Sequence, residues 1–442
     1  MSAKKILAAC LYCFLILFFW AQGPLSAEED KSSPLSLEQV VHIALKANLD
    51  VQTSNSETEA AEHAKKKSRT NFFPTLNATY QYKQNEKEIR SPYIGIITPK
   101  ERYTLATSIT QPLFNGFSIA NQYKMSELNL DMTKANKKRV RQDVALEVTK
   151  AYFEILKAEK FFKVSKETVN QVSAQTDVVN NFYQVGMSPL NDLLESQVLL
   201  ASAKQEVVFT KNDLDIARSY MNTLLRRPTS QALEIVDMLD YKPFEHGLDF
   251  CIRTALEKRV ELKMADIEIE LAEKDILLAK KTYYPTINLT GTYYRVGTEW
   301  DVSGGKDIGD VDTWDITAVA SWDFWDWGRT SYGTREQKSR RSQAILNRSR
   351  IEDSIQFSVT QAYLQMQTSE KNITTIETAI EQAKENVRIN EERYKEQVAT
   401  STDVLTAQTL LFRTMNNSYR ALYDFQIAKA SLYREMGQEN FE

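Results

Sequence analysis

Two kinds of hydrophobic spacing alternate along the chain. Apolar and aromatic residues occupy every second position in two segments, which predicts β-hairpins within 75–113 and 286–325. After each hairpin the apolar residues are spaced by three and four for long distances, which is typical of helices that pack as coiled coils. The helices predicted in this way cover 117–184, 190–227, 329–396 and 401–437.

A further helix is predicted before each hairpin, and a proline ends it. Residues 37–70 carry spaced apolar positions, with Ser36 as the candidate N-cap and Pro74 just beyond the end. The second half repeats this order, because a helical pattern reaches Lys281 and Pro285 breaks it. The element order helix, hairpin, helix, helix therefore occurs twice.

The two halves also match residue by residue at a constant offset of 211 positions. Phe72-Phe73-Pro74 corresponds to Tyr283-Tyr284-Pro285, and Ala151-Tyr152 corresponds to Ala362-Tyr363. A unit of this length is far longer than a solenoid repeat. The sequence therefore predicts a mixed α and β fold, with two copies of one unit around a pseudo-symmetry axis. The copies cover 28–227 and 248–442, joined by a linker at 228–247.

The N-terminus has the pattern of an export signal. Lys4-Lys5 precedes an unbroken apolar run at 6–20, which is the length of a signal-peptide core and short for a membrane span. We expect cleavage after Ala27, so that 1–27 is a signal peptide, rather than lipidation at Cys10. Only Cys251 then remains, which excludes an intrachain disulfide.

Composition excludes several classes of function. The formal net charge of −4 argues against a nucleic-acid partner. The three histidines have no metal-ligand spacing around them, and no catalytic triad, Walker loop or dinucleotide fingerprint is present. We therefore expect neither an enzyme nor a bound cofactor.

The strands have the pattern of an outer-membrane barrel. Each has about ten residues, one apolar face, one face of small polar residues and aromatic residues near its ends. The alternative is a soluble sheet with one solvated face, but the export signal and the crowding of aromatic residues favour the barrel. The apolar positions expected to face lipid are Leu105, Ile109, Ile316 and Trp322.

One chain cannot close such a barrel, because it supplies four strands and the smallest spanning barrels use eight. Several chains must therefore share one barrel, since an open edge in lipid leaves backbone groups unpaired. The long helices would be about three times longer than a bilayer is thick, so they would project far into an aqueous space. A shared barrel continued by a long helical bundle is a conduit.

The chain resembles the TolC-like outer-membrane efflux proteins over nearly its whole mature length. The resemblance rests on the duplicated plan, on the two aromatic-proline entries to the first strands, on Pro112-Leu113-Phe114-Asn115-Gly116, and on the helical turns at 183–186 and 403–408. It implies a homotrimer with a twelve-stranded barrel in the bacterial outer membrane and a twelve-helix tunnel across the periplasm. It also implies docking of a periplasmic adaptor that links the tunnel to an inner-membrane pump.

The same resemblance implies a gate at the periplasmic tips. Asp192 and Asp403 correspond to tip aspartates, and Tyr394 corresponds to a gating tyrosine that would hydrogen-bond Asp192. The alternative is that both aspartates are first-turn carboxylates stabilised by the helix dipole. The chain departs from the family pattern at Ala399 and Thr406, which weakens one expected latch and one expected charge ring.

Two helical turns resemble adaptor-docking turns. Since the second turn lacks the glycine of the first, we expect it to use another geometry. The residues of the two turns are Val185, Gly186, Met187 and Ser188, and Val398, Ala399 and Thr400. The sequence thus predicts a passive export channel; the alternative is a periplasmic coiled-coil scaffold that never enters lipid.

Overall fold

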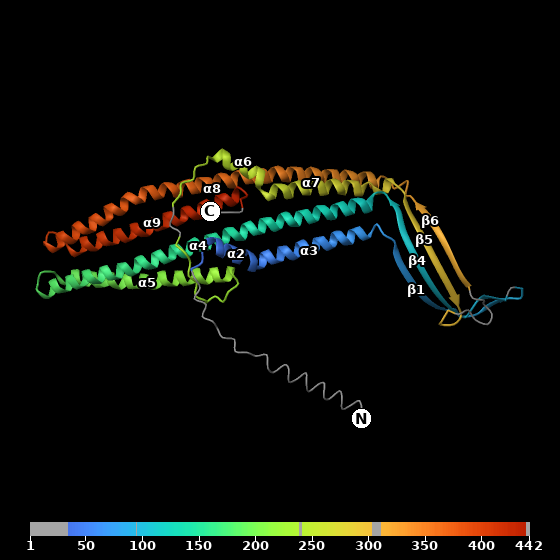
Figure 1. Ribbon diagram of the computed structural model, residues 1–442, viewed down its shortest axis with the longest axis horizontal. Helices are drawn as coiled ribbons and strands as arrows, with labels where there is room; N and C mark the ends of the chain where they lie inside the picture. The colour runs from blue at the N-terminus through green and yellow to red at the C-terminus, as the bar shows by residue number, and fades with distance from the viewer. Residues whose placement is uncertain (1–33, 94, 238–240, 303–310, 439–442) are drawn as a thin grey trace, which may run out of the picture.

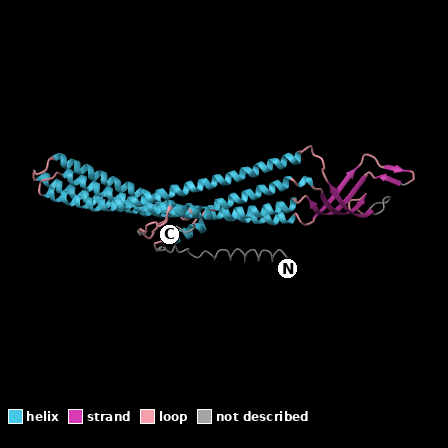
Figure 2. Ribbon diagram, turned by 90° about the horizontal axis from the view of Figure 1, so that it is seen from above, coloured by secondary structure: helices cyan, strands magenta, loops and turns pink. Residues whose placement is uncertain are grey.

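The molecule is elongated, with the sheet at one end and paired long helices running to the other (Figure 1). The computed structural model describes residues 34–93, 95–237, 241–302 and 311–438. The expected signal peptide at 1–27 lies outside the described residues. The helices and the sheet form separate zones along the long axis (Figure 2).

The first helical segment is two helices, so the single helix expected over 37–70 is wrong. Helix α2 covers Leu37–Ala47 and α3 covers Leu49–Thr70. Between them Asn48 has an extended backbone, and its side chain accepts hydrogen bonds from the backbone N–H groups of Asp50, at 2.8 Å, and Val51. Asn48 thus caps α3, which ends one helix and begins the next.

The second repeat has the same break at the equivalent position. Helix α6 covers Leu248–Lys258 and α7 covers Val260–Ala279, with Arg259 extended between them. A short 3₁₀ turn, η1, follows at Lys281–Tyr283. The duplication therefore includes this break in the helix.

Four antiparallel strands form one sheet in the order β1-β4-β5-β6. Thr75 pairs with Thr110 in the first hairpin and Thr286 pairs with Ser321 in the second, so the two hairpins have the same register. Within the described residues, the outer edges of β1 and β6 have no partner strand. The strands are β1 Thr75–Gln84, β4 Glu101–Asn115, β5 Thr286–Gly297 and β6 Val311–Ser321.

Two features of the hairpins differ from the prediction. The loop between β1 and β4 contains a second small sheet, β2 (Ile89–Ser91) and β3 (Gly95–Thr98), which extends beyond the end of the main sheet (Figure 2). Strand β6 ends at Ser321, whereas the hairpin was expected to continue to 325.

The register divides the sheet into an apolar and a polar face. Ile109 lies opposite Leu76 on one side and Gly291 on the other, and Gly291 lies opposite Ile316. Directly opposed residues share a face, so these apolar side chains lie together. Leu105 has the same alternation as Ile109, and Trp322 follows directly after β6. The other face carries small polar residues: Asn77, Ser108, Thr110, Thr290, Thr292 and Thr317.

Four long helices form two antiparallel hairpins (Figure 1). Helix α4 (Ser118–Gln184) pairs with α5 (Leu190–Leu224), and α8 (Arg329–Lys395) pairs with α9 (Ser401–Glu435). The 67 residues of α4 extend over about 100 Å at the helical rise. None of the described helices has the length and apolar character needed to cross a membrane.

The two apolar cores lie at mid-length, where the short helices α2 and α6 pack on the long ones (Figure 1). The first core joins α2, α4 and α5 to the linker, and the Tyr152 hydroxyl at its centre donates to the Val236 carbonyl. The second core joins α6, α8 and α9, with Phe425 and Cys251 fully buried. These cores fix the middle of the long helices, whereas the segments towards the tips have only small apolar clusters.

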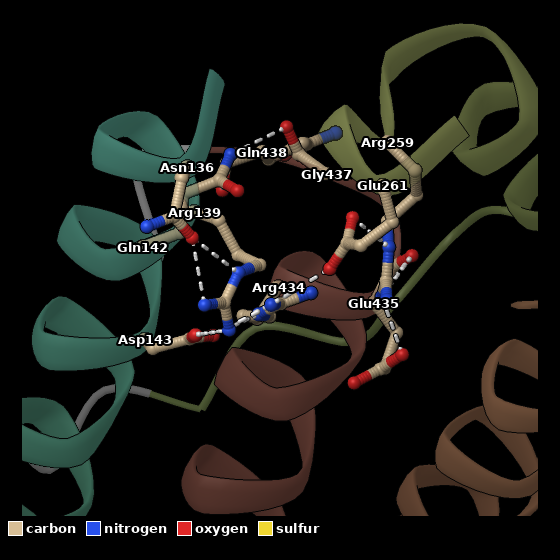
Figure 3. Close-up of polar contacts among 10 residues, drawn as sticks. All are labelled: Asn136, Arg139, Gln142, Asp143, Arg259, Glu261, Arg434, Glu435, Gly437 and Gln438. Carbon is tan, nitrogen blue, oxygen red and sulfur yellow. Dashed lines mark hydrogen bonds and ion pairs between the residues drawn. The ribbon is translucent and has the colours of Figure 1, made fainter. Parts of the chain in front are cut away.

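A partly buried polar network joins the two repeats (Figure 3). The guanidinium group of Arg434, near the end of α9, lies 2.6 Å from the Asp143 carboxylate on α4 and 3.0 Å from that of Glu261 on α7. Arg259 completes the network by pairing with Glu261 and Glu435. Burial opposes ionisation of Glu261, but the two arginines hold its pKa below the usual value.

Candidate functional site

The first helical tip ends α4 with a Schellman turn. The N–H of Gly186 donates to the Tyr183 carbonyl at 3.0 Å, and the N–H of Met187 donates to the Phe182 carbonyl at 2.8 Å. Gly186 takes a φ of 77°, a left-handed conformation that costs glycine little. Pro189 then precedes the first turn of α5.

The second tip uses the same turn, so the expectation of a different geometry is wrong. The N–H of Gln397 donates to the Tyr394 carbonyl at 3.0 Å, and the N–H of Val398 donates to the Arg393 carbonyl at 2.9 Å. Gln397 takes a φ of 62° although it is not glycine. The helix-end hydrogen bonds therefore impose the left-handed conformation on a residue for which it costs about 1–2 kcal/mol.

The residues expected to dock an adaptor lie at these two turns. Val185, Met187 and Val398 are well exposed, and Gly186 is exposed between them. Ser188 and Ala399 are half-buried, and Thr400 is the N-cap of α9. The two tips touch where Gln397 Nε2 lies 3.9 Å from Met187 Sδ.

Asp403 is part of a capping box at the start of α9. The N–H of Thr400 donates to Asp403 Oδ2 at 2.8 Å, and the N–H of Asp403 donates to Thr400 Oγ1 at 3.2 Å. The first of these bonds lowers the pKa of Asp403, with the Thr400 hydroxyl adding to it. The helix-start interpretation thus accounts for this carboxylate within one chain.

Asp192 has a weaker local environment. It lies in the first turn of α5, half-buried, and accepts a hydrogen bond of 3.4 Å from the Ser188 hydroxyl. No other hydrogen bond or ion pair to its carboxylate occurs within the described residues. Asp192 therefore retains free acceptor capacity near the tip.

Tyr394 lies in a small apolar cluster between the two helical hairpins. It is 6% exposed, packs with Val179, Leu193 and Val404, and its ring centroid lies 5.5 Å from that of Phe182. Burial raises its pKa, the nearby Ser188 hydroxyl opposes this, and the Asp192 carboxylate raises the pKa further. The Tyr394 hydroxyl has no hydrogen-bond partner in the described part of the chain, so the expected bond to Asp192 does not form within one chain.

The sequence did not reveal a groove between the two helical hairpins. A cavity of about 450 Å³ lies between α4, α5 and α9, and a second of about 430 Å³ lies between α5 and α9. Arg413 lines both cavities, and the Thr402 hydroxyl donates to Glu195 Oε2 at 3.0 Å beside the second. A sequence signal that could have revealed this groove is the pair Arg413 and Arg420, which lie seven residues apart on one face of α9.

The described residues form no candidate metal site, at the tips or elsewhere. They contain no group of three or more histidine, cysteine, aspartate or glutamate side chains that would hold a metal ion.

Comparison with known proteins defines the class. The model of the family "Outer membrane efflux protein" matches residues 40–225 and 251–438, which are the two repeats. The chain belongs to this family, and it is therefore a channel protein of the bacterial outer membrane that serves efflux or secretion.

Individual relatives are distant but cover most of the chain. Outer membrane protein TolC of Vibrio cholerae is 22% identical over 394 residues, with 86% of each chain covered. Alkaline protease secretion protein AprF of Pseudomonas aeruginosa is 20% identical and covers 98% of this chain and 88% of its own. The solved CmeC outer membrane channel of Campylobacter jejuni has a TM-score of 0.80 at 16% identity, covering 94% of this chain and 90% of its own. This likeness extends the shared fold to nearly the whole molecule, and the relatives are channels rather than enzymes.

Proposed function

We propose that three copies of this chain form a passive export conduit that works by transport and not by catalysis. Each copy contributes the four-stranded sheet to a twelve-stranded barrel and the two helical hairpins to a twelve-helix tunnel. The observation that carries the proposal is the sheet itself, which has one apolar face and outer edges at β1 and β6 that no strand of the described residues covers. In lipid those edges require partner strands, and further copies supply them.

The helical tunnel spans an aqueous compartment on one side of the membrane. The length of α4, about 100 Å, fits a periplasmic extension, and its exposed tip carries Val185 and Met187. A periplasmic adaptor docks at the two tips and connects the tunnel to an inner-membrane pump that supplies substrate and energy. The relatives named for protease secretion and for efflux support this class of partner.

The gate lies at the tips. Three copies would bring six carboxylates, from Asp192 and Asp403, around the tunnel end, where they attract cations and repel anions. The free acceptor capacity of Asp192 supports this role, whereas the capping box gives Asp403 a structural role as well. Tyr394, whose buried hydroxyl forms no hydrogen bond with the residues that the structure describes, supplies the latch between neighbouring helices.

The competing function is a periplasmic scaffold whose hairpins pair with another sheet outside the membrane. Fractionation separates the two, because the channel resists carbonate extraction from the outer-membrane fraction and a scaffold is released. Purified protein in planar bilayers gives the second test. Discrete conductance steps support the channel, and carbonate release together with the absence of conductance contradicts it.

A further inference from the structure

The strand β4 extends beyond its hairpin partner and is completed by the other repeat. Pairing of β1 with β4 ends at Thr110, but β4 continues to Asn115 by pairing with β5, where Gln111 lies opposite Leu289. The register of this pairing shifts by one residue between Pro112 and Phe114. Tyr284 closes this corner. Its ring lies edge-on to those of Phe114 and Phe117, at centroid distances of 6.2 and 5.4 Å.

The second repeat lacks this completion. Strand β6 ends at Ser321, at its last pair with β5, and the residues equivalent to the end of β4, 322–326, are in no strand. Their aromatic side chains contact only neighbouring rings and stay largely open, since Phe324 is 79% and Trp325 68% exposed. By the offset of 211, the residue that corresponds to Tyr284 is Phe73, which lies exposed at the opposite edge of the sheet.

We propose that 322–326 complete β6 by pairing with β1 of a second copy, in the register that β4 has with β5. The shared register of the two hairpins shows that the duplication fixes strand alignment. Transferring the pairs Thr110 with Thr290 and Ile109 with Gly291 by the offset places Ser321 opposite Thr79 of the partner subunit and Ala320 opposite Tyr80 of the partner subunit. This proposal rests on the proposed shared barrel and specifies its seam.

Side-chain sizes across this seam are complementary. On the apolar face Trp322 meets Ala78 of the partner subunit, and Ala318 and Ala320 meet Tyr82 and Tyr80 of the partner subunit, so each large side chain opposes a small one. On the polar face Ser321 meets Thr79 and Asp323 meets Asn77 of the partner subunit. A one-residue slip would place apolar side chains opposite polar ones.

A slip of the β6–β1 pairing by two residues also fits less well than the proposed register. In one direction Trp322 meets Tyr80 of the partner subunit, so two large rings compete for one place. In the other direction Ala320 meets Ala78 of the partner subunit, which leaves a gap. In the proposed register Phe73 of the partner subunit approaches Trp325 as Tyr284 approaches Phe114, and the exposed aromatic residues at the end of β6 become covered.

Cysteine cross-linking tests the register in the full-length protein, purified in mild detergent and oxidised. Directly opposed residues of an antiparallel pair have Cα atoms about 4.5–5.5 Å apart, which is within disulfide reach. The test variant is Thr79→Cys with Ser321→Cys, two exposed polar positions on opposite edges of the sheet that cannot reach each other within one chain. Of the three native cysteines, Cys10 and Cys13 lie in the expected signal peptide, and Cys251 is fully buried and stays in place.

Matched controls keep Ser321→Cys and move the second cysteine by two residues, to Asn77→Cys or Gln81→Cys, on the same face. We expect covalent dimers and trimers on a non-reducing gel for the Thr79 variant, at least about fivefold more than for either control, because the slipped pairs lie beyond disulfide reach. Equal or stronger cross-linking of a slipped pair overturns the register.

The mass of the same samples before oxidation separates this inference from the proposed function. If the protein is a trimer but the variant with Thr79→Cys and Ser321→Cys does not cross-link, the proposed register is wrong and the shared barrel is not contradicted. A monomer contradicts both.

Discussion

Gln397 occupies in the second helical tip the left-handed backbone position that Gly186 occupies in the first, with φ of 62° and 77°. Both turns make the same pair of helix-end hydrogen bonds, from residues related by the offset of 211. The duplication has thus kept the turn while the residue type has changed. The second tip is consequently under more backbone strain than the first.

This difference predicts opposite effects of exchanging the two residues. Gln397→Gly should raise the free energy of unfolding by up to about 1 kcal/mol, because glycine relieves the left-handed strain although it gains entropy in the unfolded chain. Gly186→Gln should lower it by about 1–2 kcal/mol. Thermal unfolding followed by circular dichroism in detergent checks both, and a loss of stability in Gln397→Gly would mean that its contact with Met187 outweighs the strain.

The Arg434 network predicts a strong dependence of stability on one side chain. Its side chain is 8% exposed, and Arg434→Ala removes the cation that Asp143 and Glu261 share. Asp143 keeps its pair with Arg139 and Glu261 keeps its pair with Arg259, so the cost should be about 1.5–3 kcal/mol, the range for hydrogen bonds to charged groups. The matched control is Arg341→Ala, which breaks an exposed pair with Glu273 and should cost less than about 1 kcal/mol. Equal shifts in the melting temperature of the two variants would contradict the anchoring role.

The faces of the sheet predict which charged substitutions are tolerated. Ile109→Arg or Ile316→Arg places a charge on the apolar face and should impair assembly by roughly 2–4 kcal/mol if that face meets the bilayer midplane. Ser108→Arg, one residue away on the polar face, should assemble better. Outer-membrane yield and heat stability of the assembled protein are the readouts, and the same result for Ile109→Arg and Ser108→Arg would refute the assignment of the faces.

The gate predicts separable effects on selectivity and conductance. Asp192→Asn with Asp403→Asn removes the negative potential at the tips and should reduce cation selectivity and block by multivalent cations in planar bilayers. Tyr394→Phe removes a hydroxyl and no charge, so conductance should rise with little change in selectivity. Unchanged selectivity in the double variant would leave Asp403 with its capping role alone.

How much the sequence predicts depends on whether the signal is periodic. The long helices and the two hairpins were readable because their hydrophobic spacing extends over many turns and strand residues. The break at Asn48 was missed because it depends on one capping side chain within a continuing helical pattern. The conformation of Gln397 was missed because backbone hydrogen bonds, and not residue type, impose it.

The end of β6 was missed for another physical reason. The pattern of 322–325 predicts a strand, but a strand needs a partner to supply its hydrogen bonds, and the described residues of the single chain offer none there. The hydroxyl of Tyr394 is similar, since its expected acceptor is not reached within the chain. Both departures occur where we propose that a second copy completes the structure.

The mass of the purified protein in mild detergent, measured under native conditions, tests the shared barrel most directly. We expect a single species of three chains, because each chain supplies a four-stranded sheet whose outer edges, at β1 and β6, have no partner strand among the described residues. A stable, folded monomer that keeps its strand and helix content would contradict it.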